Sequence, residues 1–183
     1  MEAPQKGQLL LSEPFMQDPY FKGAVVFLCE FREEGAFGLI VNKPTETKVH
    51  EAVDDFPEVE NVIYYGGPVQ PNTLHYLHRR NDLLPDSIEV AEGIFWGGDF
   101  ERLVFLLDTK QIAPDEIRFF FGYSGWEQDQ LLREMEEKSW IVSDVKQEYL
   151  FEEDPKDLWR NILLSMGDRY RIIANFPEHP SLN

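Results

Sequence analysis

Short apolar runs separated by turn-forming residues make up the first two thirds of the chain. Such runs, rich in β-branched and aromatic side chains, are typical of β-strands, and an uninterrupted run indicates a strand buried on both faces. The runs at residues 24–29 and 36–42, with Glu33-Glu34-Gly35 between them, predict an antiparallel hairpin. Strands are predicted at residues 7–11, 24–29, 36–42, 61–65, 73–78, 94–96, 118–121 and 140–145.

Apolar residues that recur every three or four positions predict helices later in the chain. Asp99 is a suitable N-cap, and apolar residues follow it at positions 100, 103, 104 and 107. In the last helix, Asp154 is the cap, Pro155 occupies the first helical position and Gly167 ends the helix. A short helix is also predicted over residues 48–55.

One more helix is predicted to begin at Ser124 or Gly125 and to continue to about Lys138. The strands before Asp99 have no helices between them that could serve as crossovers, which disfavours a regular βαβ arrangement. The chain is therefore predicted to be an α+β protein with a mixed, largely antiparallel sheet. Because no linker-like stretch divides the chain, we expect one domain over residues 1–183.

Composition narrows the classes of function. The chain has 17 Lys and Arg against 34 Asp and Glu, a net charge of −17, which disfavours direct binding to nucleic acid. With 43% apolar residues it is too hydrophobic to be disordered. Cys29 is the only cysteine, so no disulfide forms within the chain. The N-terminus lacks a signal-peptide pattern and the longest apolar run is too short for a bilayer, so we expect a cytoplasmic protein that does not enter membranes.

Three features of the sequence suggest a chemical function. Residues 122–126 compare with a nucleophile elbow, but Trp126 replaces its second glycine, and a helix cap at Ser124 is the simpler interpretation. The same glycine turn could alternatively expose backbone N–H groups to an anion. His75 and His78 suggest a metal, yet three residues apart on a strand they face opposite sides, so no metal site and no cofactor are expected.

Several segments together resemble one bacterial protein family. Residues 33–44 resemble the E-G-A-x-G-L-(V/I)-(V/I)-N-(K/R)-P segment of the AlgH/YqgE family, and residues 65–69 are similar to its GGPV motif. Residues 122–126, followed by Gln130, Glu134 and Trp140, resemble its G-Y-x-G-W…Q-L…E…W block. The segments occur in the family's order, and the resemblance extends from about residue 7 to residue 167.

The resemblance implies a fold and a label rather than a reaction. The expected fold is a sheet bent into a partial barrel with about three to four helices outside, and its core covers residues 7–167. The family is often labelled a transcriptional regulator, and it supplies no established catalytic residues. Glu127-Gln128-Asp129 replaces the family's commoner Gly-x-Gly, which places Glu127 and Asp129 in the first turn of the predicted helix.

Three hypotheses for function follow from the sequence. The first is a regulator or adaptor that acts through protein contacts, with direct DNA binding implied only by the family label. The second is a domain or enzyme that binds a small anion in a crevice between residues 42–44, 66–68 and 122–126, although no complete catalytic set is visible. The third is a structural protein whose glycines serve the fold. The candidate ligand-binding residues are Asn42, Lys43, Gly66, Gly67, Tyr123, Ser124, Gly125 and Trp126, with Lys43 to meet an anion, Tyr123 as a polar contact and Trp126 as a stacking face.

Overall fold

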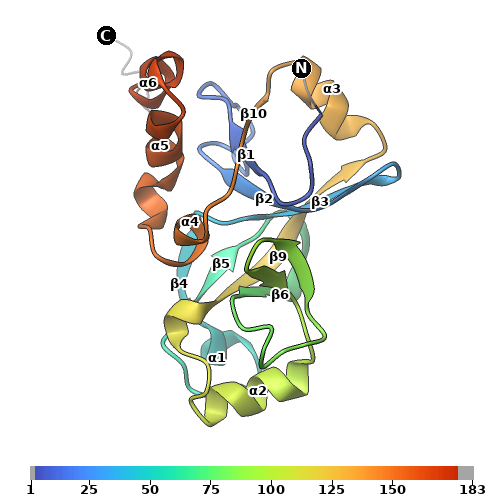
Figure 1. Ribbon diagram of the computed structural model, residues 1–183, viewed down its shortest axis with the longest axis vertical. Helices are drawn as coiled ribbons and strands as arrows, with labels where there is room; N and C mark the ends of the chain where they lie inside the picture. The colour runs from blue at the N-terminus through green and yellow to red at the C-terminus, as the bar shows by residue number, and fades with distance from the viewer. Residues whose placement is uncertain (1–2, 177–183) are drawn as a thin grey trace.

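The computed structural model describes residues 3–176 and contains a ten-stranded sheet (Figure 1). The main order of strands is β10-β1-β2-β3-β9-β6-β8-β7, and every pair along it is antiparallel. The strands are β1 (Leu9–Ser12), β2 (Val25–Arg32), β3 (Gly35–Ile40), β4 (Pro44–Lys48), β5 (Val62–Tyr65), β6 (Val69–His78), β7 (Ile88–Ala91), β8 (Ile94–Trp96), β9 (Ile117–Glu127) and β10 (Trp140–Ser143). All eight predicted strands are present, and β4 and β7 are additional.

Helices lie on both sides of the sheet. They are α1 (Val49–Ala52), α2 (Phe100–Asp108), α3 (Gln130–Glu136), α4 (Gln147–Phe151), α5 (Pro155–Ser165) and α6 (Asp168–Ala174), with a 3-10 turn at Pro114–Glu116. The predicted caps of α2 and α5 are confirmed: the Asp99 side chain accepts a hydrogen bond from the Arg102 N–H, and the Asp154 side chain accepts one from the Lys156 N–H. α4 and α6 were not predicted, because each is short and lacks a clear cap.

The long strand β9 determines the shape of the sheet. Its first half pairs in parallel with β5, its second half pairs with β3, and β6 pairs along its other side. The sheet therefore branches at β9 and remains open, with β10 and β7 at the ends of the main path and β4 at the edge of the branch. The α+β class and the largely antiparallel sheet are confirmed. The expected partial barrel is wrong, because the sheet neither closes nor curls strongly.

The helix predicted from Ser124 or Gly125 is wrong at its start. β9 continues through the glycine motif to Glu127, because Ala36 and Phe37 of β3 pair with Trp126 and Gly125. α3 begins only at Gln130, so Glu127 ends a strand instead of lying in a helical turn. Asp129 precedes α3 with a φ of 61°, a left-handed conformation that glycine adopts most easily.

Three hydrophobic clusters form the core, and alternate residues of the same strands supply different clusters. The first packs beneath α4, α5 and α6, the second beneath α1 and α2, and the third beneath α3. β9 contributes Phe120 to the first, Phe119 to the second and Trp126 to the third. Figure 1 shows β9 running through the middle of the molecule between these helical layers. β1 and β2 are buried on both faces, as their uninterrupted apolar runs predict.

Candidate functional site

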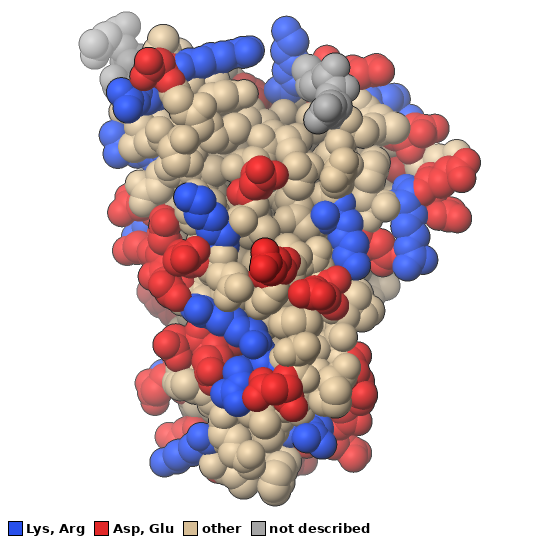
Figure 2. All heavy atoms as spheres, in the orientation of Figure 1, with Lys and Arg blue, Asp and Glu red and all other residues tan. Residues whose placement is uncertain are grey.

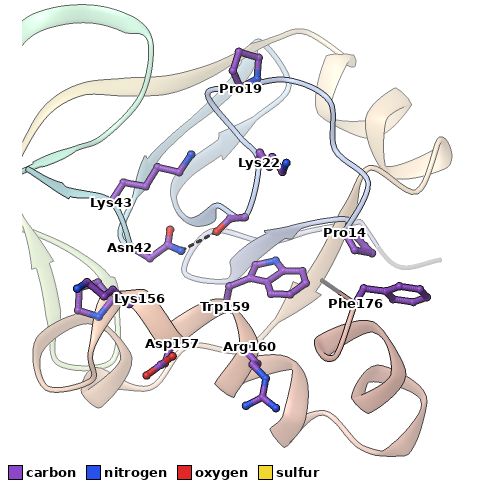
Figure 3. Close-up of a pocket in the computed structure, with 12 residues that line it drawn as sticks. Pro14, Pro19, Lys22, Asn42, Lys43, Lys156, Asp157, Trp159, Arg160 and Phe176 are labelled. Carbon is purple, nitrogen blue, oxygen red and sulfur yellow. Dashed lines mark hydrogen bonds between the residues drawn. The ribbon is translucent and has the colours of Figure 1, made fainter. Parts of the chain in front are cut away.

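A hollow lies between the β1–β2 loop, the β3–β4 connection and α5 (Figure 3). Its volume is about 640 Å³, within the range of pockets that accept small molecules. Trp159 of α5 projects into it, and Asn42 and Lys43 lie on the wall opposite α5. The full lining is Pro14, Pro19, Lys22, Gly23, Asn42, Lys43, Pro155, Lys156, Asp157, Trp159, Arg160 and Phe176.

Asn42 fixes one wall of this hollow. Its amide nitrogen donates to the Gly23 carbonyl at 2.8 Å, the dashed line in Figure 3, and its oxygen accepts from the Val25 N–H at 2.9 Å. Because both polar ends of the side chain are used, Asn42 holds the β1–β2 loop against the end of β3. Trp159 is fixed similarly, since its indole N–H donates to the Ser12 carbonyl at 3.0 Å. The walls of the hollow are therefore set by side chain–backbone hydrogen bonds.

Lys43 is the best-placed charge in the hollow. Its ammonium group donates to the Tyr20 carbonyl at 2.8 Å and forms no ion pair with any carboxylate in residues 3–176. Burial lowers the pKa of Lys43, and the negative charge of Asp18 partly opposes that change. A half-buried ammonium group without a carboxylate partner is well suited to an anionic ligand.

The residues that line the hollow carry a net positive charge, opposite in sign to the net charge of the whole protein. Lys22, Lys43, Lys156 and Arg160 line it, and Asp157 is the carboxylate among the lining residues. In the complete chain acidic residues outnumber basic ones by 34 to 17. Arg160 is held by Asn175 at 2.9 Å, and Figure 3 shows Arg160 and Asp157 extending away from the centre of the hollow. The inner charge therefore comes chiefly from the lysines.

The other predicted site residues are placed elsewhere. Gly66 and Gly67 pack against the backbone of β9, where the Ser124 hydroxyl donates to the Gly66 carbonyl at 3.1 Å. The Lys43 carbonyl accepts from the Tyr65 N–H at 2.8 Å, and the Gly66 N–H donates to the Phe121 carbonyl at 2.9 Å, so main-chain hydrogen bonds join residues within or next to the three predicted segments. Ser124 is fully buried within β9, which excludes the predicted helix cap at this residue.

Tyr123 and Trp126 belong to two different environments. The Tyr123 ring centroid lies 4.7 Å from that of Phe37 and 5.8 Å from that of His75. Gly125 is exposed and pairs with Phe37 in the register of β3 and β9. Trp126 is buried in the third cluster, although its edge and Tyr123 both line a shallow hollow beside β3. Of the eight predicted residues, the structure places Asn42 and Lys43 in the deep hollow.

The motif around Trp126 forms a hydrogen-bond network centred on Glu134. The Glu134 carboxylate accepts from the indole N–H of Trp126 at 2.9 Å and from that of Trp140 at 2.7 Å. Gln130 donates to the same carboxylate at 3.0 Å. The residues of the G-Y-x-G-W…Q-L…E…W block thus join α3 to β9 and β10.

His75, His78 and Cys29 are buried or half-buried in the fold, and the His75 Nε2 has no hydrogen-bond partner among the described residues. His75 and His78 lie on opposite faces of β6, as their spacing predicts; His78 hydrogen-bonds to the Gly97 carbonyl at 2.9 Å. Burial raises the pKa of the Cys29 thiol, which keeps it protonated and unreactive. No group of three His, Cys, Asp or Glu side chains within residues 3–176 is arranged to hold a metal ion.

Sequence reasoning missed most of the hollow's lining. Nothing in the sequence around Lys22 indicates a binding site, because it is a single lysine in a loop. The spacing of Lys156 and Arg160 indicates only that they lie on the solvent side of α5. Trp159 packs against the first cluster with the apolar side of α5, but the part of it that faces the hollow depends on where β1 and β2 lie. Segments from four regions of the chain meet here, and local spacing cannot reveal such a meeting.

Comparison with known proteins identifies the family. The model of the AlgH-like family matches residues 9–171. A UPF0301 protein of Chlorobium limicola is 44% identical over 177 residues, covering 97% of this chain and 95% of that protein. A UPF0301 protein of Cytophaga hutchinsonii is 40% identical over 179 residues, covering 97% and 98%. The chain therefore belongs to the AlgH-like family, as its motifs predict.

Solved structures agree with this assignment. The solution structure of the AlgH protein from Pseudomonas aeruginosa has a TM-score of 0.75 and 25% identity, covering 98% of this chain and 100% of that one. The crystal structure of protein DIP2367 from Corynebacterium diphtheriae has a TM-score of 0.76 at 19% identity and shares the fold, covering 96% and 94%. Within the described residues, no helix is long and apolar enough to cross a membrane.

Proposed function

We propose that this AlgH-like protein binds a small anionic molecule in the hollow between the β1–β2 loop and α5. The observation that carries this proposal is the local reversal of charge, because cations gather around a concave site in a protein with a net charge of −17. Lys43 and Lys22 are the residues to meet the anion. Trp159 offers a flat apolar face, so the ligand class is an acid with a planar or apolar part.

The charge of the whole molecule limits the size of the ligand. The general field of an acidic protein repels polyanions, whereas a compact anion inside the hollow is nearest to the lysines. Nucleic acid, which depends on many phosphate contacts, fits this arrangement poorly. We therefore expect a metabolite-sized acid, such as a nucleoside monophosphate or an aromatic carboxylate.

Fluorescence titration of the protein with adenosine monophosphate, benzoate and phosphoglycolate tests the proposal. We expect at least one probe to change tryptophan emission saturably, and Lys43→Met to weaken its binding by about 10-fold, or about 1.4 kcal/mol. Lys110→Met removes the same charge from the turn after α2 and is the matched control. Trp159→Phe should remove most of the signal. The proposal fails if no probe binds below millimolar concentration, or if both lysine variants bind alike.

A regulator or adaptor that works through protein contacts is the second candidate. Acidic side chains gather along both sides of the face in Figure 2, with basic side chains scattered among them, and this surface favours basic partners. A complex with a basic protein that weakens with salt and survives Lys43→Met would support this candidate. A duplex DNA complex with a steep salt dependence would instead support direct regulation.

A further inference from the structure

Two arginines lie side by side on the face of the sheet that carries the first hydrophobic cluster. Arg118 of β9 stands opposite Leu77 in the β6–β9 register, and Arg79 follows two residues after Leu77. Residues two apart on a strand share a face, and diagonal neighbours on paired strands are within reach of each other. The Arg79 guanidinium stacks on Phe151 at 4.6 Å, and that of Arg118 stacks on Tyr64 at 4.8 Å. Both rings belong to the first cluster, which confirms the common face.

Only one of the two arginines forms an ion pair with a carboxylate of the described residues. Arg79 pairs with Glu152 at 2.9 Å, whereas Arg118 forms no ion pair among the described residues and bonds only to the Tyr64 hydroxyl. The Asp154 side chain caps α5, and its negative charge adds to burial, the main cause, in raising the pKa of Tyr64. Burial lowers the pKa of Arg118, and the nearby Arg79 lowers it further. Buried charges in proteins are normally paired, so one half-buried guanidinium here lacks its counterion.

Unused hydrogen-bond donors point to the kind of counterion required. The Arg79 Nε–H is buried and has no acceptor among the described residues. The Tyr64 oxygen accepts from Arg118, which leaves the phenolic proton free to donate. Arg118 has five N–H donors and uses one of its nitrogens on Tyr64. A ligand that satisfies these groups must offer several acceptors and a negative charge, which is the chemistry of an oxyanion.

We propose that Arg118, Arg79 and Tyr64 form a binding site for a phosphate or carboxylate group, between β9 and the start of the α4–α5 connection. The site is separate from the Lys43 hollow, since none of its three residues lines that hollow. Arg79 also lines an open depression that carries Glu92, Glu148 and Lys146, whereas Arg118 and Tyr64 do not line it. This inference does not rest on the proposed function.

Phosphorus NMR with inorganic phosphate tests the site directly. At constant ionic strength, we expect the wild-type protein to broaden the phosphate signal and Arg118→Leu to reduce binding at least 10-fold. Tyr64→Phe removes one donor and keeps the aromatic ring, so it should weaken binding about 3-fold to 10-fold without unfolding the protein. Arg133→Leu, which removes an exposed arginine from α3, is the matched control. Acetate in competition distinguishes a carboxylate site from a phosphate site.

The outcomes separate a ligand site from a purely structural cluster. If Arg118 has no counterion in the ligand-free protein, the Arg118→Leu variant should melt within a few degrees of wild type in chloride buffer. Phosphate should then raise the melting temperature of the wild type and leave that of the variant unchanged. Wild-type protein that shows no phosphate or acetate binding up to about 50 millimolar overturns the proposal. Binding that survives both Arg118→Leu and Tyr64→Phe also overturns it, and loss of that binding in Lys43→Met would assign it to the hollow.

Discussion

At the residue scale, His78 is held in one protonation state by its neighbours. Its Nδ1 accepts from the Arg80 N–H at 3.1 Å, so Nε2 carries the proton and donates to the Gly97 carbonyl at 2.9 Å. The side chain is fully buried, and burial lowers the pKa of His78 below its ordinary value despite the Gly97 bond. Protonation of Nδ1 would break the bond to Arg80 and place a charge in the core.

This arrangement makes stability depend on pH. Because the folded pKa of His78 is depressed, its contribution is complete above the unfolded pKa of about 6.5 and is lost as pH falls toward the folded value. We expect the melting temperature to fall between pH 7.5 and 5.5. His78→Gln should show a smaller fall over this range, because glutamine does not titrate. His75, whose pKa burial also lowers, accounts for part of the remaining slope. An unchanged slope in His78→Gln would assign the effect elsewhere.

Residue-level predictions from the sequence succeeded where the determining contacts are local. Asp99 and Asp154 cap helices through hydrogen bonds to residues two or three positions away, so spacing alone identifies them. Ser124 has similar local signals, but its hydroxyl bonds to Gly66, 58 positions away in the chain. Pairing with a distant strand overrides local preference at that residue.

At the scale of elements, one carboxylate of α3 connects this helix to two buried tryptophans of the sheet, beside the packing of Leu131 and Met135. Glu134 accepts from two indole N–H groups, and both Trp126 and Trp140 are buried. Removing the acceptor would leave two buried donors without partners, each at a cost of about 1–3 kcal/mol. The position and partners of α3 were not predictable from its own sequence, because Glu134 reads as a solvent-facing residue of an amphipathic helix.

A substitution at Glu134 measures this attachment. We expect Glu134→Ala to lower the free energy of unfolding by about 2–4 kcal/mol, and Glu134→Gln to lower it less because an amide oxygen still accepts. Glu136→Ala, on the exposed side of α3, should change it by less than about 0.5 kcal/mol. Urea denaturation followed by tryptophan fluorescence gives these values. Equal losses at positions 134 and 136 would exclude the attachment.

At the scale of the whole molecule, two glycine segments cross where the sheet branches. A side chain at Gly122 would overlap the Gly67 carbonyl, and one at Gly67 would overlap the backbone of Tyr123. The glycine motifs therefore allow the two backbone segments to pass close to each other. From the sequence, these glycines predict only turns. The deep hollow was unpredictable for a related reason, since it depends on how loops and α5 pack after the sheet has formed.

Two matched glycine substitutions isolate the cost of this crossing. Gly122 and Gly97 have similar φ values of 71° and 76°, but a side chain at Gly97 would meet nothing within 4 Å. We expect Gly97→Ala to cost about 1–2 kcal/mol through backbone strain alone. Gly122→Ala should cost at least about 3 kcal/mol, because strain and steric overlap add. Chemical denaturation of both variants provides the comparison, and equal costs would show that the crossing has room to relax.

The central place of β9 also has a consequence for the order of events during synthesis. β3, β5 and β6 all precede β9 in the chain, yet each pairs with it. Until Ile117–Glu127 leaves the ribosome, β5 and β6 lack the strand that joins them to the rest of the sheet. At roughly 5–20 residues per second, the nascent chain spends on the order of ten seconds with β5 able to pair only with β4 and β6 only with β8. Its excess of carboxylates then keeps waiting chains apart from one another.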